Sequence, residues 1–462
     1  MKQISTWSLV LGPCFGILLY LFLSIYIGFA PALTAGITFW VAIWWVLEPI
    51  PIPATSLIPF FAFPMSGIIS HKNVAQAYGH WLILLLMSGF ILSKGMEESG
   101  LHRRIAHHIM RLIGRENPKK IMLGVMVSTA FLSAWISNTA TCLMMLPIVI
   151  ALSQDWTQQS QKTIFLSLAY SASIGGMATP IGTPPNIILM GIYEETTQQT
   201  IAFLDWMYMA TPIASLLLAG TWLYLCQNID SASKNNSPQD IDIHSSPSPH
   251  EKRFLILFVC TAIAWITRTQ PFGGWSAWVS PSTIGDDTVG LMAVLLMFLI
   301  PRGTQPQKAL LDWETAQKIP WGLLLLFGGG IAIAKAFSDS GLSNIMGEQL
   351  TLIQNLPLLF MIGLICLCVT FLTEITSNTA TTTLLMPILA ATAVSLQLDP
   401  ILLMLPAALS ASCAFMLPVA TAPNAIVFGS DVITTKDMAK TGFAINILGV
   451  VIITSAMYVF LT

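Results

Sequence analysis

Two short polar segments inside apolar runs constrain the fold of this chain more than any other feature. SNTATCLMMLP begins at Ser137 and SNTATTTLLMP begins at Ser377, so the same polar residues recur after 240 residues. Each lies in a long apolar stretch of a chain that is 55% hydrophobic and 9% charged, whereas ordinary globular proteins carry about 25% charged residues. This composition is typical of a helical protein that crosses a membrane several times.

Other segments recur in the same order and at nearly the same spacing. WLILLLMSGF at Trp81 pairs with WGLLLLFGGG at Trp321. KGMEESGL at Lys94 pairs with KAFSDSGL at Lys335, and GTPPN at Gly182 pairs with ATAPN at Ala420. A fixed order and spacing indicate an internal repeat. We expect an extra transmembrane helix in residues 1–32, repeat 1 in 33–226, a polar cytoplasmic linker in 227–253 and repeat 2 in 254–462.

Basic residues predict how the two repeats are oriented. Residues 101–120 read as an amphipathic interfacial helix with an apolar stripe of Leu101, Ile105, Ile109 and Leu112 and several Lys and Arg, whereas the counterpart at 342–357 has none. Because cytoplasmic loops are enriched in Lys and Arg, these elements should lie on opposite sides of the membrane, so the repeats should be inverted.

The apolar runs predict about eleven transmembrane helices, with the N-terminus in the cytoplasm and the protein in the inner (plasma) membrane. The expected spans are 9–29, 33–49, 53–69, 79–98, 163–194, 204–226, 254–271, 283–301, 321–340, 400–428 and 443–461.

The polar segments require broken helices. Residues 119–153 would form a helix about 52 Å long, whereas the hydrocarbon core is about 30 Å thick. We therefore expect a re-entrant helical hairpin with Ser137 to Thr139 at its tip, and a second hairpin in 357–392. Proline disfavours helix at the preceding residue, so Gly182 to Pro185 and Ala420 to Pro423 should be unwound within the membrane. Lipid cannot satisfy such backbone, which must line protein or a cavity.

Matched interruptions in two inverted halves are typical of a transporter binding site near the membrane midplane. Helix N-termini attract anions, and unwound carbonyls attract sodium. Asparagine offers both an acceptor and a donor. Because the four interrupted motifs contain no Arg, Lys or His, an anion held there needs bound cations as its counter-charge, which favours cation coupling.

These motifs, together with WWVLEPIPIPAT from Trp44 and IPWGLLLLFGGG from Ile319, resemble the divalent anion/sodium symporter family of dicarboxylate, citrate and sulfate carriers. The resemblance covers nearly the whole chain. It implies a homodimer in which a transport domain moves against a scaffold by an elevator mechanism, with at least two sodium ions carried with the anion. The protein is expected to be surrounded by membrane lipid, and nothing in the sequence predicts a nucleic-acid partner.

The resemblance also implies roles for individual residues. The implied sodium ligands are Ser133, Ser137, Asn138 and Gly182 at the first site and Thr373, Thr376, Asn378 and Ala420 at the second. The implied substrate contacts are Asn138, Thr139, Thr183 and Pro184 in repeat 1 and Asn378, Thr379, Thr421 and Ala422 in repeat 2. The favoured substrates are C4-dicarboxylates such as succinate, malate and fumarate.

Several alternatives stay open at this point. Some members of the family are exchangers without sodium coupling, and an intramembrane enzyme or a channel would also need polar residues at depth. Enzyme function is disfavoured because Ser137 and Ser377 have no His or Lys in their motifs. Glu374 could carry a proton or serve as a structural partner, and the second is preferred because repeat 1 has Ala134 there. The histidines at 102–108 are expected to be a solvated surface with no metal.

Overall fold

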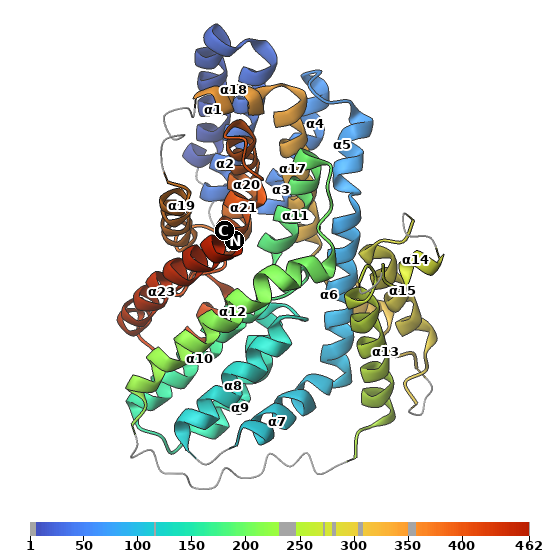
Figure 1. Cartoon of the computed structure of the whole chain (residues 1–462), viewed down its shortest axis with the longest axis vertical. Helices are drawn as coiled ribbons and strands as arrows, with labels where there is room; N and C mark the ends of the chain where they lie inside the picture. The colour runs from blue at the N-terminus through green and yellow to red at the C-terminus, as the bar shows by residue number, and fades with distance from the viewer. Residues whose placement is uncertain are drawn as a thin grey trace.

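The described part of the chain is built from α-helices and contains no β-strand (Figure 1). A computed structural model describes residues 6–114, 117–230, 246–270, 273–279, 283–303, 308–349 and 357–461. The expected all-helical fold is therefore confirmed. Residues 231–245 of the expected linker and 350–356 of the second interfacial segment lie outside the described residues.

The N-terminal part forms two packed helices, followed by short ones. Helices α1 (Thr6–Ile27) and α2 (Phe29–Leu47) pack along each other. The span expected over 53–69 is interrupted by a turn, because the chain there forms α3 (Ile52–Thr55) and α4 (Ile58–Met65). Each of these two begins with a proline in its first turn, where the missing N–H costs no helical hydrogen bond. Two more helices follow, α5 (His71–Tyr78) and α6 (Trp81–Ser99).

Helix α7 (Leu101–Ile113) is amphipathic, as expected. Its buried residues are Leu101, His102, Ala106 and Met110, whereas Leu112 of the apolar stripe is 73% exposed. His102 was expected to be solvated, but it is buried with Nδ1 3.2 Å from the Met96 carbonyl oxygen. The turn at Gly100 rotates the buried face toward α8 and α6. Burial lowers the pKa of His102.

The rest of repeat 1 contains the expected interruptions. A hairpin of α8 (Pro118–Ser133) and α9 (Asn138–Ser153) is followed by α10 (Gln158–Gly176), α11 (Pro184–Thr197), α12 (Phe203–Leu225) and the short 3-10 helix η1 (Cys226–Asn228). Residues 134–137 turn between the first two helices, and residues 177–183 are unwound between α10 and α11.

Repeat 2 has the same order of elements. Its helices are α13 (Pro249–Ile266), α14 (Ser276–Val279), α15 (Asp286–Leu299), α16 (Trp313–Ala316), α17 (Trp321–Asp339), α18 (Leu342–Gln349), α19 (Leu358–Thr373), α20 (Asn378–Ser395), α21 (Ile401–Ala411), α22 (Ala422–Phe428) and α23 (Thr435–Leu461). The turn at 374–377 and the unwound residues 412–421 match the interruptions of repeat 1.

The prolines of both unwound motifs lie elsewhere than expected. Pro184 and Pro185 were placed in unwound chain, as were Ala422 and Pro423, yet these four residues form the first turns of α11 and α22. The unwound segments instead lie on the N-terminal side of the motifs. Proline fits the start of a helix because its fixed φ suits the helix and its missing N–H would be unpaired there anyway.

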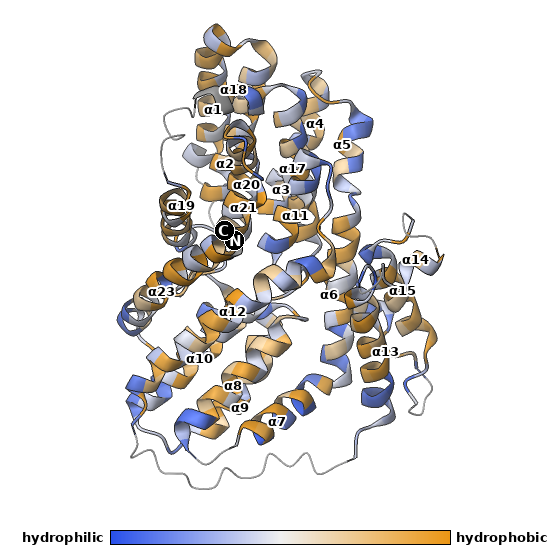
Figure 2. Cartoon of the chain, viewed as in Figure 1, coloured by the Kyte–Doolittle hydropathy of each residue, from blue (hydrophilic) through white to orange (hydrophobic). Residues whose placement is uncertain are grey.

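Six stretches of helix in the described ranges are long and apolar enough to cross a membrane. They are Trp7–Ile27, Phe29–Leu47, His71–Ser99, Phe203–Asn228, Trp321–Asp339 and Thr435–Val459. Figure 2 shows orange, hydrophobic residues along most of these helices. The count of eleven spans stays a prediction, since several of the other apolar helices are short, among them α9 and α19.

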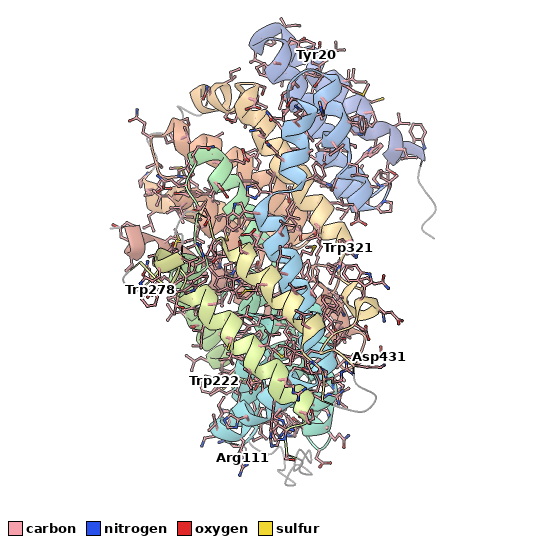
Figure 3. The ribbon with its side chains drawn as sticks, turned by 90° about the vertical axis from the view of Figure 1, so that its right-hand side faces the viewer. Tyr20, Arg111, Trp222, Trp278, Trp321 and Asp431 are labelled. Carbon is pink, nitrogen blue, oxygen red and sulfur yellow. The ribbon has the colours of Figure 1, made fainter. Side chains whose placement is uncertain are left out.

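The counterparts α7 and α18 lie at opposite ends of the molecule (Figure 1). In Figure 3 the labelled Arg111 of α7 lies near one end and Tyr20 of α1 near the other.

Candidate substrate and sodium site

Three oxygen atoms meet at the turn of the first hairpin. The hydroxyl of Ser133, the last residue of α8, lies 2.6 Å from Asn138 Oδ1 and 2.6 Å from the carbonyl oxygen of Ala172 on α10. Ser133 is fully buried, and Asn138 is the first residue of α9. We call these three atoms the first oxygen cluster.

The second hairpin repeats this arrangement. The hydroxyl of Thr373, the last residue of α19, lies 2.7 Å from Asn378 Oδ1 and 2.9 Å from the carbonyl oxygen of Ala411 on α21. Thr373 is also fully buried. These atoms form the second oxygen cluster. The expected ligands Ser133, Asn138, Thr373 and Asn378 are thus brought together in equivalent pairs.

Each cluster has more acceptors than protons. A hydroxyl carries one hydrogen, whereas Ser133 and Thr373 each face two acceptor oxygens at hydrogen-bond distance. The one proton serves both acceptors, so each cluster is rich in oxygen lone pairs. These oxygens are suited to coordinate a monovalent cation. Sodium suits hydroxyl, amide and carbonyl ligands of this kind, since hard cations prefer oxygen.

Gly182 lies against Gly176, which in turn lies against Asn138 of the first oxygen cluster. A side chain at Gly176, the last residue of α10, would collide with Asn138 Oδ1, and one at Gly182 would collide with the Gly176 carbonyl oxygen. Asn138 and Gly182 thus both lie against Gly176, where only glycine fits. The Ser137 hydroxyl instead accepts a hydrogen bond from Ala140 N at 3.3 Å and caps α9. Its hydroxyl therefore has a structural role in this arrangement.

At the second cluster, the expected ligands Thr376 and Ala420 are placed differently. The Thr376 hydroxyl lies 2.9 Å from the Leu372 carbonyl oxygen and 2.5 Å from Thr381 Oγ1, so it is engaged within its own hairpin. Ala420 lies in the unwound segment, where its N–H donates to the carbonyl oxygen of Leu417 at 3.2 Å. The Ala172 and Ala411 carbonyls, by contrast, were not found from sequence, because a backbone ligand leaves no residue-type signal.

The candidate substrate residues lie at four helix starts that pack in crossed pairs. Helix α9 of the first hairpin packs against α22 of repeat 2, and α20 of the second hairpin packs against α11 of repeat 1. Cys142 Sγ on α9 lies 3.7 Å from the carbonyl oxygen of Pro423 on α22. These helix starts carry the substrate residues Asn138, Thr139, Thr183, Pro184, Asn378, Thr379, Thr421 and Ala422.

Equivalent substrate residues differ in exposure. Thr139 is exposed, whereas its counterpart Thr379 is 7% exposed. Thr183 is buried, and Thr421 caps α22 by accepting a hydrogen bond from Asn424 N at 3.3 Å. Ala422, which replaces the proline of repeat 1, is exposed. The two halves of the candidate site are therefore not equivalent in this conformation.

Two asparagines that sequence reasoning did not assign hold the unwound segments in place. Asn186 Nδ2 donates to the carbonyl oxygens of Gly176 at 3.0 Å and Thr179 at 2.7 Å. Asn424 Nδ2 donates in the same way to Ala414 and Leu417, both at 3.0 Å. The sequence could have indicated this role, because each asparagine directly follows the proline of the matched motif in its repeat. Each amide replaces donors that the interrupted helix lacks.

We expect Asn186→Ala to lower the stability of the purified protein by about 2–3 kcal/mol, because buried carbonyls would lose their donor. The measurement is the thermal unfolding midpoint in detergent. Asn344→Ala, at an exposed position on α18, is the matched control and should leave the midpoint unchanged. An equal midpoint for both variants would contradict the bracing role of Asn186.

Aromatic packing distinguishes the two hairpin tips. Trp135, two residues before Ser137, stacks on Phe203 of α12 at 6.0 Å between ring centroids, and Phe203 stacks on Trp265 of α13 at 4.9 Å. The equivalent of Trp135 in the second hairpin is Ile375, which is 75% exposed. The first tip is therefore docked against α13, whereas the side chain of the second tip at this position is free.

Comparison with known proteins decides the family. The sequence model of a family described as citrate transporter matches residues 42–405. The chain belongs to this family. It is a multi-pass membrane transporter and not an enzyme, and its resemblance to the divalent anion/sodium symporters is confirmed.

Curated relatives of this transporter match over almost its whole length. It is 39% identical to a protein of Staphylococcus saprophyticus over 98% of this chain and 90% of that protein, and 40% identical, with the same coverage, to one of Staphylococcus aureus strain NCTC 8325. Both relatives are named sodium-dependent dicarboxylate transporter SdcS.

Two solved transporter structures share the fold of this family member. The YdaH transporter of Alcanivorax borkumensis gives a TM-score of 0.58 at 12% identity, covering 83% of this chain and 86% of that one. MtrF of Neisseria gonorrhoeae gives a TM-score of 0.55 at 11% identity, covering 84% and 82%. At such identities the likeness concerns the fold alone.

Proposed function

We propose that this transporter is a sodium-coupled symporter of divalent organic anions, with C4-dicarboxylates such as succinate, malate and fumarate as substrates. The observation that carries the proposal is the duplicated oxygen cluster, in which one hydroxyl faces two acceptor oxygens in each repeat. The relatives named sodium-dependent dicarboxylate transporter support the same coupling and substrate class.

In the proposed mechanism each hairpin supplies one sodium site and one end of the substrate site. Sodium at each cluster is coordinated by the hydroxyl of Ser133 or Thr373 and by the amide oxygen of Asn138 or Asn378. Backbone oxygens, including those of Gly182 and Ala420, complete the shells, with Ser137 and Thr376 contributing through their main chains. The asparagine NH2 groups and the Thr139 and Thr379 hydroxyls then donate to the carboxylates.

Sodium supplies the positive charge that the site lacks. The four motifs contain no Arg, Lys or His, so a dianion has no fixed counter-charge in them. Bound sodium next to each asparagine would attract a carboxylate to the other side of the same amide. Binding of the two ligands is therefore cooperative, and each increases the affinity for the other.

The proposal includes the membrane arrangement. Repeat 1 (33–226) and repeat 2 (254–462) are inverted, residues 1–32 form an additional helix, the linker 227–253 is cytoplasmic, and about eleven helices span the inner membrane with the N-terminus inside. The positions of α7 and α18 at opposite ends (Figure 1) support inversion. The homodimer is proposed on the family resemblance alone.

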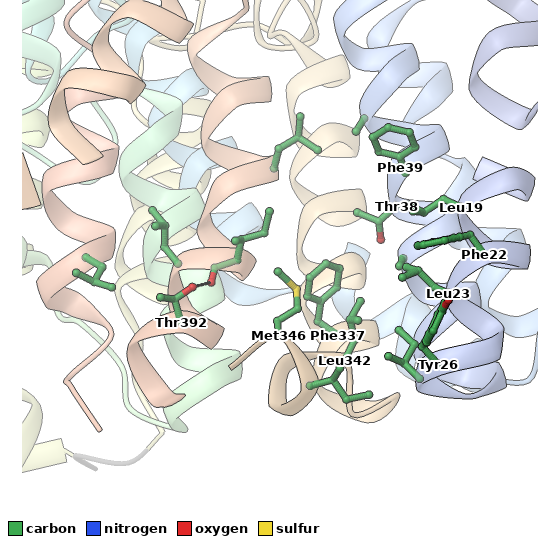
Figure 4. Close-up of a pocket in the computed structure, with 18 of the residues that line it drawn as sticks. Leu19, Phe22, Leu23, Tyr26, Thr38, Phe39, Phe337, Leu342, Met346 and Thr392 are labelled. Carbon is green, nitrogen blue, oxygen red and sulfur yellow. Dashed lines mark hydrogen bonds between the residues drawn. The ribbon is translucent and has the colours of Figure 1, made fainter. Parts of the chain in front are cut away.

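An elevator movement is proposed between two groups of helices. A cavity of about 1120 Å³ separates α1 and α2 from α19 and α20, with α17 and α18 along its side (Figure 4). Its lining is almost entirely apolar, including Phe22 and Tyr26 on one side and Leu364 and Leu384 on the other. An apolar boundary with few directional contacts can slide at low cost. The docked first tip and the free second tip also suit alternating access.

The test is uptake of radiolabelled succinate, malate and fumarate into proteoliposomes containing the purified protein. An inward sodium gradient should drive accumulation, and replacing sodium by choline should abolish it. Accumulation that depends on dicarboxylate inside the vesicles and is insensitive to sodium would instead identify an exchanger. Uptake that equilibrates without accumulation would identify a channel.

A further inference from the structure

A buried carboxylate accepts hydrogen bonds from the unwound segment of repeat 2. Glu374 is 4% exposed and follows Thr373 at the end of α19. Its Oε1 accepts from Phe415 N at 2.7 Å and Met416 N at 2.8 Å, and its Oε2 accepts from Leu417 N at 3.1 Å. Three successive backbone N–H groups therefore point at one side chain, in an arrangement that suits an anion.

A fourth donor completes the surroundings of Glu374. Asn446 Nδ2, from α23, donates to Oε1 at 2.7 Å, and Asn446 is itself fully buried. In the described ranges, no Lys, Arg or His forms an ion pair with this carboxylate. Because all four contacts are donors, nothing among them can receive a proton from Glu374. The geometry favours a structural role over proton carriage.

Repeat 1 holds the same segment with neutral groups only. Ala134 takes the place of Glu374, and its carbonyl oxygen accepts the Thr179 hydroxyl. Trp206 Nε1 and Thr211 Oγ1 donate to the carbonyl oxygens of Met177 and Ala178, both at 3.0 Å. Both unwound segments are held by side-chain hydrogen bonds, but only the segment of repeat 2 is held by an acidic side chain.

This acidic side chain is linked to the second oxygen cluster by two routes. Glu374 is the direct neighbour of Thr373, whose hydroxyl is the centre of the cluster. Leu417 donates its N–H to Glu374, and its carbonyl oxygen accepts the Ala420 N–H at 3.2 Å and Asn424 Nδ2 at 3.0 Å. The position of Ala420, which the proposed function assigns to sodium, thus depends on the Leu417 that Glu374 holds.

We propose that Glu374 is a positioning residue that makes the second sodium site bind more tightly than the first. It orders the segment 415–417 that leads to Ala420, and its negative charge attracts the cation. This assignment rests on the sodium coupling proposed above. It predicts that two sites built from equivalent residues fill at different sodium concentrations, the second before the first.

The direct test is Glu374→Gln. Glutamine has the same shape, but its NH2 cannot accept from backbone N–H groups, and the charge is lost. The sodium dissociation constant of the second site, measured by calorimetric titration of sodium without substrate, should rise about tenfold. The dicarboxylate concentration for half-maximal uptake, measured at saturating sodium, should change less than about twofold. A residue with only a general folding role would not separate these two quantities.

The matched control is Glu251→Gln. Glu251 also accepts backbone and side-chain donors, because it caps α13 at Ser248 and pairs with Arg104 at 3.1 Å. It lies in the first turn of α13, near the end of the expected linker, and belongs to neither oxygen cluster. Its substitution should leave the sodium dependence unchanged. If Glu251→Gln and Glu374→Gln weakened sodium binding equally, the assignment of Glu374 would be overturned.

A second comparison keeps the proposal testable if Glu374→Gln does not fold. Thr373→Ala and Ser133→Ala remove equivalent hydroxyls. Because uptake needs both sodium ions, the weaker first site sets the sodium requirement, so Ser133→Ala should raise it several-fold more than Thr373→Ala. Equal effects, or a larger effect of Thr373→Ala, would overturn the ranking of the sites. A wild-type protein with no sodium dependence would overturn the proposed function as well, whereas a sodium-dependent wild type with an unchanged Glu374→Gln would overturn this assignment alone.

Discussion

Replacing Asn378 by alanine should reduce sodium-driven dicarboxylate uptake by about 100-fold or more. The side chain takes part in both proposed ligand sites. Its Oδ1 lies 2.7 Å from the Thr373 hydroxyl in the second oxygen cluster, and its NH2 is the proposed donor to a substrate carboxylate. Loss of hydrogen bonds to charged groups costs about 1.5–3 kcal/mol each, and two such losses give this factor.

Asn138→Ala should have an effect of the same kind through the first cluster, where Asn138 Oδ1 lies 2.6 Å from Ser133 Oγ. Initial uptake rates at several sodium and succinate concentrations are the measurement, with protein amount determined by immunoblotting. Asn344→Ala on α18 serves as the control and should keep wild-type rates. Wild-type uptake by well-expressed Asn378→Ala would remove this residue from the site.

The hairpins and unwound segments were predictable because their signals are local. A stretch too long for one span with Ser137 or Ser377 at its centre requires a turn, and the observed turns lie at 134–137 and 374–377. The prolines correctly predicted interruptions, but they were assigned to the unwound chain. They lie in the first turns of the helices that follow. A proline there cannot donate a hydrogen bond to the preceding residues, so the earlier helix ends before it, while the new helix can begin at it.

Tertiary contacts explain what the sequence could not predict. The Ala172 and Ala411 carbonyls come from helices α10 and α21, and any residue offers the same carbonyl oxygen. The face of α7 that becomes buried depends on the turn at Gly100 and on α8, so His102 could not be told from His107 and His108, which are not buried. The four donors around Glu374 come from two segments far along the chain.

The second large effect concerns substrate binding without sodium. If two bound sodium ions provide the counter-charge of the dianion, their removal should weaken dicarboxylate binding by a factor on the order of 30 to 100. The reason is electrostatic, because the four motifs that form the site offer amides and hydroxyls but no basic side chain. By linkage, saturating succinate should increase the product of the two sodium association constants by the same factor.

The most direct measurement is calorimetric titration of succinate into the purified protein in sodium buffer and in choline buffer of equal ionic strength. We predict clear saturable binding in sodium and binding at least about 30-fold weaker in choline. Titration of Asn344→Ala in both buffers should reproduce the wild-type difference. Equal succinate affinity in the two buffers would contradict the account, because the oxygen clusters would then have no part in holding the dicarboxylate.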